Sequence, residues 1–154
     1  NGLWMKDSDE VYNGWNGLLK MYAGFCSTGT PVPRPQRIMR TILQCRSDAA
    51  GHFGPGQCTN YNACYLLGHL SVAAAMACRD DILGAFEWYA TCVEARHDAA
   101  SGQFRRNPLW PHEGEPDATG TWSAREESRW IAAYCRHLLD ATDSAINPPV
   151  PEDH

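Results

Sequence analysis

The sequence lacks the features that mark membrane-spanning, nucleic-acid-binding and phosphate-loop proteins. Its longest apolar run, around residues 71–78, is far shorter than the ~20 residues that cross a bilayer. The formal net charge of −5 gives no overall basic character, so we expect no nucleic-acid partner and no membrane span. Neither a Gly-rich phosphate loop nor a Gly-x-Ser-x-Gly turn occurs, which leaves a P-loop enzyme and a Ser/His/Asp hydrolase unsupported.

A cysteine-based metal or disulfide framework is also missing. The cysteines are odd in number and form no C-x-x-C pair, and most fall inside helical patterns. We therefore predict buried free thiols in a reducing compartment, the cytoplasm. Because the chain starts at Asn1 without Met or a signal peptide, a processed or secreted form is the alternative. The seven cysteines are Cys26, Cys45, Cys58, Cys64, Cys78, Cys92 and Cys135.

What the chain does have is enough apolar material for one domain. Hydrophobic residues make up 44% of its 154 residues and charged residues 20%. A domain of this size buries roughly 68–70% of its unfolded surface. Six Trp, six Tyr and four Phe suit a packed helical core, or a cavity that stacks on sugar rings.

A Gly-x-aromatic signature recurs three times, at Gly2-Leu3-Trp4, Gly51-His52-Phe53 and Gly102-Gln103-Phe104. The segments 48–53 and 98–104 also agree almost residue for residue. The three signatures begin 49 and 51 residues apart, and a nearly constant period of about 50 residues is typical of repeat architectures. We predict three repeats over residues 2–50, 51–101 and 102–146, all in one domain, followed by a Pro-rich tail over residues 147–154.

Apolar spacing and start signals predict an all-α fold with five main helices. The first covers residues 9–25, is capped by Asp7 or Ser8 and is closed by Gly24 and Gly29. The second covers residues 35–47, behind a Pro-rich turn.

The third predicted helix is capped by Thr59 and is apolar on almost every face, so we expect it to be buried all round. The fourth starts at Asp80-Asp81 and is apolar on one side only. The fifth follows a capping box at residues 123–126. Inner and outer helices therefore alternate along the chain.

A helical hairpin of about fifty residues that follows a Gly-x-aromatic turn resembles the unit of the α/α-toroid architecture. That group includes the six-hairpin glycosidases, the toroidal polysaccharide lyases, and the terpenoid-cyclase and prenyltransferase barrels. The chain holds about two and a half such hairpins, fewer than a closed toroid needs. The resemblance therefore implies a partial barrel, completed by a longer chain, a second copy in a homo-oligomer, or another chain that covers the apolar edges.

In such toroids the loops that enter the inner helices line the cavity mouth, and segments 4–16, 52–65 and 107–129 take that position here. Polar and aromatic side chains converge in them, as carbohydrate recognition requires. The candidate catalytic residues are Tyr61, His52, Glu126 and Arg125. The candidate substrate-binding residues are Trp4, Asn13, Trp15, Asn60, Asn62, His112, Trp122 and Arg129.

Each candidate also has a structural interpretation. His52 is then a turn residue that fixes its loop. Residues 60–62 then use their polar side chains to bond backbone groups at the start of the third helix. Glu126 completes the capping box, and Asp80-Asp81 suits the helix dipole. The segment 112–115 matches no established metal cage, so we predict no metal and no cofactor.

Three functions stay open at this point. The first is a carbohydrate-active module that acts on or binds an oligosaccharide, as a glycoside hydrolase with two carboxylates or as a lyase with a Tyr or His base beside an arginine. The second is a non-catalytic helical scaffold that binds a partner. The third is a fragment of a terpenoid cyclase or prenyltransferase barrel, to whose acidic motif residues 7–10 are similar.

Overall fold

The computed structural model describes residues 2–5, 10–54, 57–95, 97–100 and 103–104. Over these residues the chain is helical, with α1 (Val11–Thr28), α2 (Pro35–Gln44), α3 (Gln57–Ala73) and α4 (Arg79–Glu94). A two-residue hairpin follows, with β1 (His97–Asp98) antiparallel to β2 (Gln103–Phe104). The predicted fifth helix, the third repeat beyond residue 104 and the tail lie outside the described residues.

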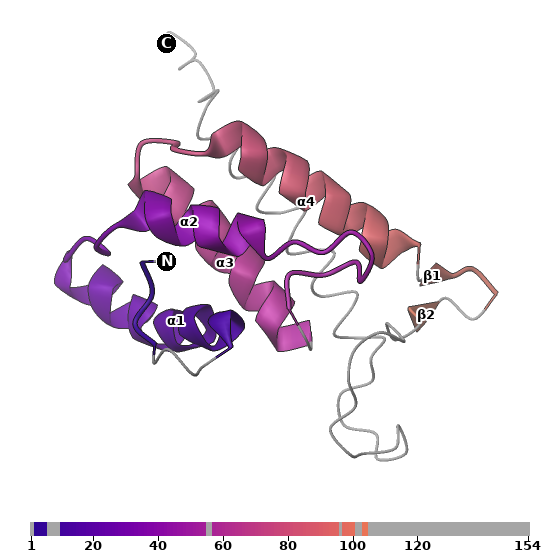
Figure 1. The fold of residues 1–154 in the computed structure, drawn as a ribbon, viewed down its shortest axis with the longest axis horizontal. Helices are drawn as coiled ribbons and strands as arrows, with labels where there is room; N and C mark the ends of the chain where they lie inside the picture. The colour runs from indigo at the N-terminus through magenta and orange to yellow at the C-terminus, as the bar shows by residue number, and fades with distance from the viewer. Residues whose placement is uncertain (1, 6–9, 55–56, 96, 101–102, 105–154) are drawn as a thin grey trace, which may run out of the picture.

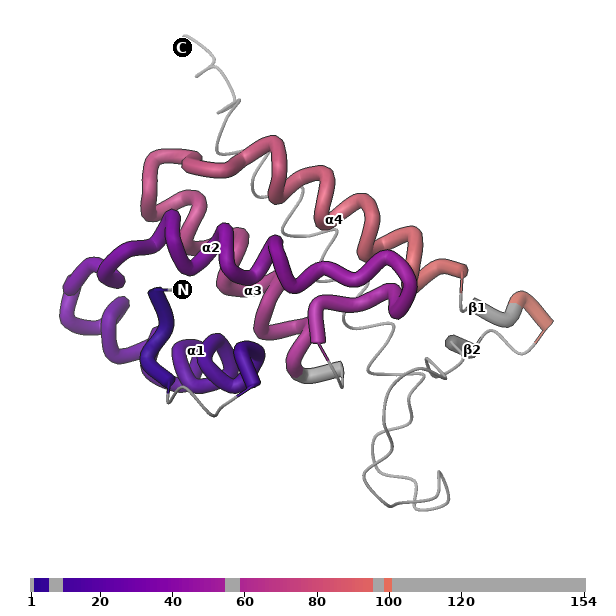
Figure 2. The backbone as a smooth tube through the Cα atoms, viewed as in Figure 1, coloured from indigo at the N-terminus to yellow at the C-terminus, as the bar shows by residue number. Residues whose placement is uncertain are grey.

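Helix α3 occupies the centre of the described bundle and packs against α1, α2 and α4, while α2 also contacts α4 (Figures 1 and 2). One side of α3 fills the core with Leu66, Leu67 and Leu70, all fully buried. The prediction of burial on every side is wrong at the last turn, where Val72 is 52% exposed. It also fails along one face, where tyrosine and histidine rings are only half-buried.

Helix α1 starts at Val11 and ends where Gly29 adopts a left-handed φ of 65°. Gly29 therefore closes the helix as predicted, because glycine adopts this conformation without the Cβ clash. The prediction that Gly24 helps to close it is wrong, since Gly24 lies inside the helix. Trp15, Leu18 and Tyr22 are buried, as their helical spacing predicts.

Helix α2 has Pro35 in its first turn, which suits a residue without an N–H group. It ends at Gln44, before the predicted residue 47, because Ser47 forms an antiparallel bridge with His52 instead. Its core side is Ile38, Met39 and Ile42, as the apolar stripe predicts.

The sequence predicts the first turn of α4 better than that of α3. Helix α3 begins at Gln57, so Thr59 lies within the first turn and the prediction that it caps the helix is wrong. Helix α4 begins at Arg79 and places Asp80 and Asp81 in its first turn, where acids favour the helix dipole, as predicted.

The described residues repeat one order of elements. Two helices are followed by the bridge between Ser47 and His52, and two more helices are followed by the β1–β2 pair. Both antiparallel pairs enclose the similar sequence segments, because Ser47 and His97 each lie one residue before segments 48–53 and 98–104. The three repeat boundaries and the α/α-toroid arrangement stay predictions. No helix in the described ranges is both long and apolar enough to cross a membrane.

Candidate functional site

Asn60, in the first turns of α3, fixes the loop that leads into this helix. The side chain is fully buried. Its Oδ1 accepts a hydrogen bond from the backbone N–H of Phe53 at 2.8 Å, and its Nδ2 donates to the carbonyl oxygen of Gly54 at 2.8 Å. Both contacts satisfy backbone groups that burial would otherwise leave unpaired. Asn60 therefore serves the fold here, in line with its structural interpretation.

A second polar link joins α1 to α3. The indole Nε1 of Trp15 donates to the carbonyl oxygen of Thr59 at 3.1 Å, and the Trp15 ring is fully buried. Asn16 Nδ2 donates to the Thr59 hydroxyl at 3.2 Å, and Asn62 Nδ2 donates to Asn16 Oδ1 at 2.9 Å. Trp15 thus offers no ring surface to a ligand. Asn16 and Asn62 are half-buried.

Beside this link, α3 presents a stripe of rings at four-residue intervals. Tyr61, Tyr65 and His69 lie one turn apart on the same side of the helix. The Tyr61 and Tyr65 centroids are 6.0 Å apart, and His69 stacks on Tyr65 at 4.1 Å. Tyr22 of α1 meets Tyr65 edge-on at 6.0 Å and His69 at 5.8 Å. We call Tyr22, Tyr61, Tyr65 and His69 the tyrosine face.

Burial disfavours the charged forms of three members of the tyrosine face, Tyr22, Tyr65 and His69. Burial raises the pKa of Tyr22 to about 12, with smaller contributions from the hydrogen bond to Cys26 and from the charges of Cys26 and Tyr65. Burial also raises the pKa of Tyr65, assisted by Tyr61 and Cys26. Burial lowers the pKa of His69, which favours the neutral imidazole. This surface therefore offers stacking and neutral hydrogen bonding, with no fixed charge of its own.

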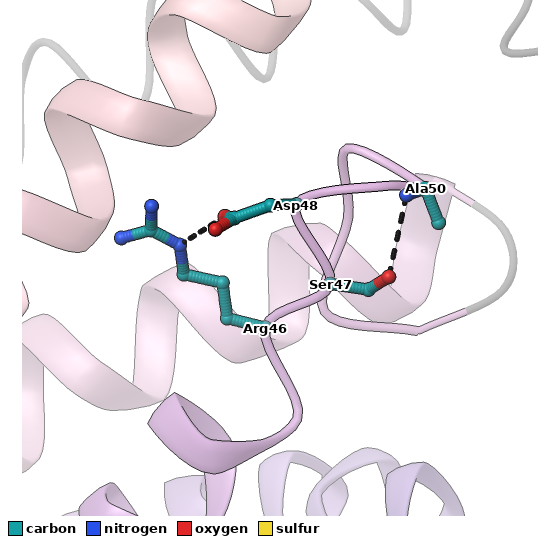
Figure 3. A network of polar contacts seen from close by, with 4 residues as sticks. All are labelled: Arg46, Ser47, Asp48 and Ala50. Atoms are coloured by element: carbon teal, nitrogen blue, oxygen red, sulfur yellow. Dashed lines mark hydrogen bonds and ion pairs between the residues drawn. The ribbon is translucent and has the colours of Figure 1, made fainter.

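The loop that carries His52 is anchored on α4. Phe53 is buried and meets Trp88 edge-on at 5.3 Å. The guanidinium of Arg46 lies 4.5 Å from the centroid of the Trp88 ring, and its Nε bonds Asp48 Oδ1 at 2.8 Å (Figure 3). His52 is half-buried and bridges Ser47, so its backbone belongs to a defined turn.

The remaining sequence candidates are spread over the structure. Trp4 is 50% exposed and stacks on Phe25 of α1, with centroids 5.9 Å apart and planes 13° apart. Phe25 and Asn16 are about two and a half turns apart on α1, so they face opposite sides of it. Asn13 is exposed on α1. Outside the described residues lie His112, Trp122, Arg125, Glu126 and Arg129.

Among the described residues, no group of three or more His, Cys, Asp or Glu side chains is arranged to hold a metal ion. The five cysteines whose side chains the structure describes are free thiols, of which Cys64 is buried and Cys26 is exposed. Burial of these thiols is thus confirmed only in part, and the cytoplasmic location stays a prediction.

Comparisons with protein-family models, with curated proteins and with solved structures found no match to this chain. The site therefore rests on its own geometry.

Sequence reasoning found Tyr61, Asn60 and Asn62 but missed Tyr22, Tyr65 and His69. Their signal was present, because Tyr61, Tyr65 and His69 are spaced at one helical turn. The sequence interpretation missed it because it treated α3 as apolar on almost every face and therefore buried all round. An aromatic ring with a polar edge is compatible with a half-buried position, and this is where all three residues of α3 lie.

Proposed function

We propose that the chain is a carbohydrate-active helical module that holds an oligosaccharide along the tyrosine face. The observation that carries this proposal is the half-buried ring stripe of Tyr61, Tyr65 and His69 beside the hydrogen-bonded amides of Asn16 and Asn62. A sugar ring presents apolar C–H faces and hydroxyl groups, and the two kinds of side chain match them. The absence of fixed charge on the face favours neutral sugars there.

The finer part of the proposal concerns chemistry. Tyr61 is the candidate base of a lyase, with Arg125 or Arg129 neutralising a substrate carboxylate, and Glu126 is the candidate acid of a hydrolase. The high pKa of Tyr22 and Tyr65 makes both poor bases near neutral pH. His69 is a second candidate base on the described part of this face, because burial lowers its pKa and so favours the neutral imidazole.

Calorimetric titration of the full chain with cellohexaose and mannohexaose tests the binding. We expect Tyr61→Ala to weaken affinity by roughly fivefold, since one stacked ring contributes on the order of 1 kcal/mol. Asn62→Ala should weaken it through the lost amide contact. The matched control is Gln44→Ala, an exposed amide on α2, which should leave affinity unchanged.

Tyr61→Phe separates stacking from proton transfer. If the residue only stacks, this variant keeps the affinity of the parent chain, and any turnover is unchanged. If it transfers a proton, binding persists while turnover is lost. Full affinity in both Tyr61→Ala and Asn62→Ala would disprove the site.

A non-catalytic scaffold is the second candidate, and the exposed apolar side chains favour it. Trp4, Met21 and Val72 are 50%, 46% and 52% exposed, and a partner protein could cover such large hydrophobic side chains. A chain that binds neither sugar, yet associates in sedimentation experiments and loses this association on Met21→Gln, would replace the carbohydrate proposal by this one.

A further inference from the structure

A stripe of arginines runs along the solvent side of α2. Arg34 precedes the helix, and Arg37 and Arg40 follow at three-residue intervals, which places neighbouring members close together on the helix surface. All three are exposed, whereas the opposite side of α2 carries the buried Ile38 and Ile42. We call Arg34, Arg37 and Arg40 the arginine stripe.

The arginine stripe is not neutralised by the described part of the protein. It lines a shallow hollow of about 620 Å³ together with Pro35 and Gln36, and no carboxylate is among these lining residues. None of the three arginines forms an ion pair with another described residue, whereas Arg46 pairs with Asp48. The first turn of α2 also lacks the acidic residues that commonly offset the positive end of the helix dipole.

An exposed aromatic ring lies two residues along the chain from a tight contact with α2. Gly2, with φ 86°, packs so tightly on α2 that a Cβ there would lie 3.3 Å from Cβ of Arg37. Two residues further on, within about 7 Å of extended chain, Trp4 stacks on Phe25 and stays 50% exposed. The N-terminal segment therefore contacts α2 beside Arg37 and carries an exposed aromatic ring two residues further along the chain.

We propose that the arginine stripe binds an acidic oligosaccharide that carries at least two carboxylate or sulfate groups. Guanidinium groups bind both kinds of anion bidentately, and Trp4 offers a stacking surface for a sugar ring. A nucleic acid fits less well, because three cations neutralise about three phosphates while specific binders commonly contact many more. The net charge of −5 also repels a long polyanion.

This site is built from other residues than the tyrosine face, because the arginines belong to α2 whereas Tyr61, Tyr65 and His69 belong to α3 and Tyr22 to α1. It does not depend on the proposed function. The test titrates the full chain at low salt with hexagalacturonate and with a sulfated hexasaccharide. Cellohexaose, a single-stranded DNA oligonucleotide and inorganic sulfate are the comparison ligands. The variants are Arg37→Ala and Arg40→Ala, and the charge-matched control is Lys20→Ala, an exposed cation on α1.

We expect at least one acidic hexasaccharide to bind, and each arginine variant to weaken it roughly tenfold. The slope of log affinity against log salt should fall by about one for each arginine removed, whereas Lys20→Ala should change affinity by less than about twofold. Carboxylate and sulfate ligands are told apart by which hexasaccharide binds more tightly.

Three outcomes would overturn the proposal. These are no binding of either acidic hexasaccharide, equal effects of Arg37→Ala and Lys20→Ala, and tighter binding of DNA or of inorganic sulfate. Because Arg37 and Arg40 are exposed, both variants are expected to fold, and thermal unfolding checks this directly. A negative result for the arginine stripe does not affect the proposal for the tyrosine face, because that site is tested by the binding of neutral sugars and by Tyr61→Ala.

Discussion

The imidazole of His69 stacks on the phenol ring of Tyr65, one turn earlier in α3, with centroids 4.1 Å apart and planes 24° apart. Tyr22 closes the edge of this stack from α1. The covering rings remove water from His69, and this desolvation lowers its pKa. The packing of the tyrosine face thus determines the charge of a group at its centre.

The first prediction is that His69 makes the folded chain sensitive to acid. Its pKa is lowered in the folded state, so between the unfolded value near 6.5 and the lower folded value the unfolded chain binds more protons. The free energy of unfolding should therefore be fully supported above about pH 6.5 and fall as the pH drops below it. Urea unfolding at several pH values measures this.

His69→Phe is the comparison variant, because phenylalanine keeps an aromatic ring but does not titrate. The variant should lose less stability than the parent chain over the same pH interval. The other five histidines are present in both proteins, so the difference between the two curves isolates His69. Identical curves would show that His69 is not desolvated in the folded state.

Apolar spacing and helix start signals predicted all four helices that the structure describes. Apolar residues at three- and four-residue spacing marked α1 and α2, because one face of each helix must be buried. The first and last residues of the helices were predicted less accurately. Thr59 resembles a helix cap, yet α3 starts at Gln57, since the Thr59 hydroxyl and carbonyl instead bond Asn16 and Trp15 of α1.

The candidate site was predicted less well than the fold. Tyr61 and Asn62 were found because they follow a Gly-x-aromatic turn, but periodicity does not show which helix packs beside them. The partner residues Tyr22 and Asn16 come from a distant part of the sequence, as the separation of 46 between Asn62 and Asn16 illustrates. Long-range contacts of this kind depend on how whole helices dock.

The second prediction concerns Gly54, which is buried where the 53–54 turn meets α1 and α3. A Cβ at this position would lie 2.9 Å from Cγ2 of Thr59 and 3.2 Å from Cβ of Tyr12. Gly54→Ala should therefore lower the free energy of unfolding by about 1–3 kcal/mol through overpacking. Gly17→Ala, with open space around it in α1, should instead raise it by roughly 0.5–1 kcal/mol. Equal effects of the two would contradict the packing described here.

The third prediction tests the structural role of Asn60. Asn60→Ala removes the partners of the Phe53 N–H and the Gly54 carbonyl, both in buried residues, and should destabilise the chain by about 2–4 kcal/mol. Asn13→Ala changes an exposed amide in the same way and should be neutral or slightly stabilising, because alanine favours the helix. A neutral Asn60→Ala that weakened sugar binding would instead assign Asn60 to the ligand.

The last prediction concerns the turn between α3 and α4, where Ala75, Met76 and Cys78 all have positive φ, at 52°, 64° and 60°. Residues with a Cβ are strained in this left-handed conformation, and Ala75 is exposed, so its methyl group makes little compensating contact. Ala75→Gly should therefore raise the free energy of unfolding by roughly 0.5–1 kcal/mol, after allowing for the greater freedom of glycine in the unfolded chain.

The control is Ala23→Gly, at an exposed position inside α1, which should lower the free energy of unfolding by about 1 kcal/mol. Opposite signs in the two alanine-to-glycine variants, measured by urea unfolding, would establish the left-handed turn. A loss of stability in both would show that residue 75 has an ordinary helical backbone.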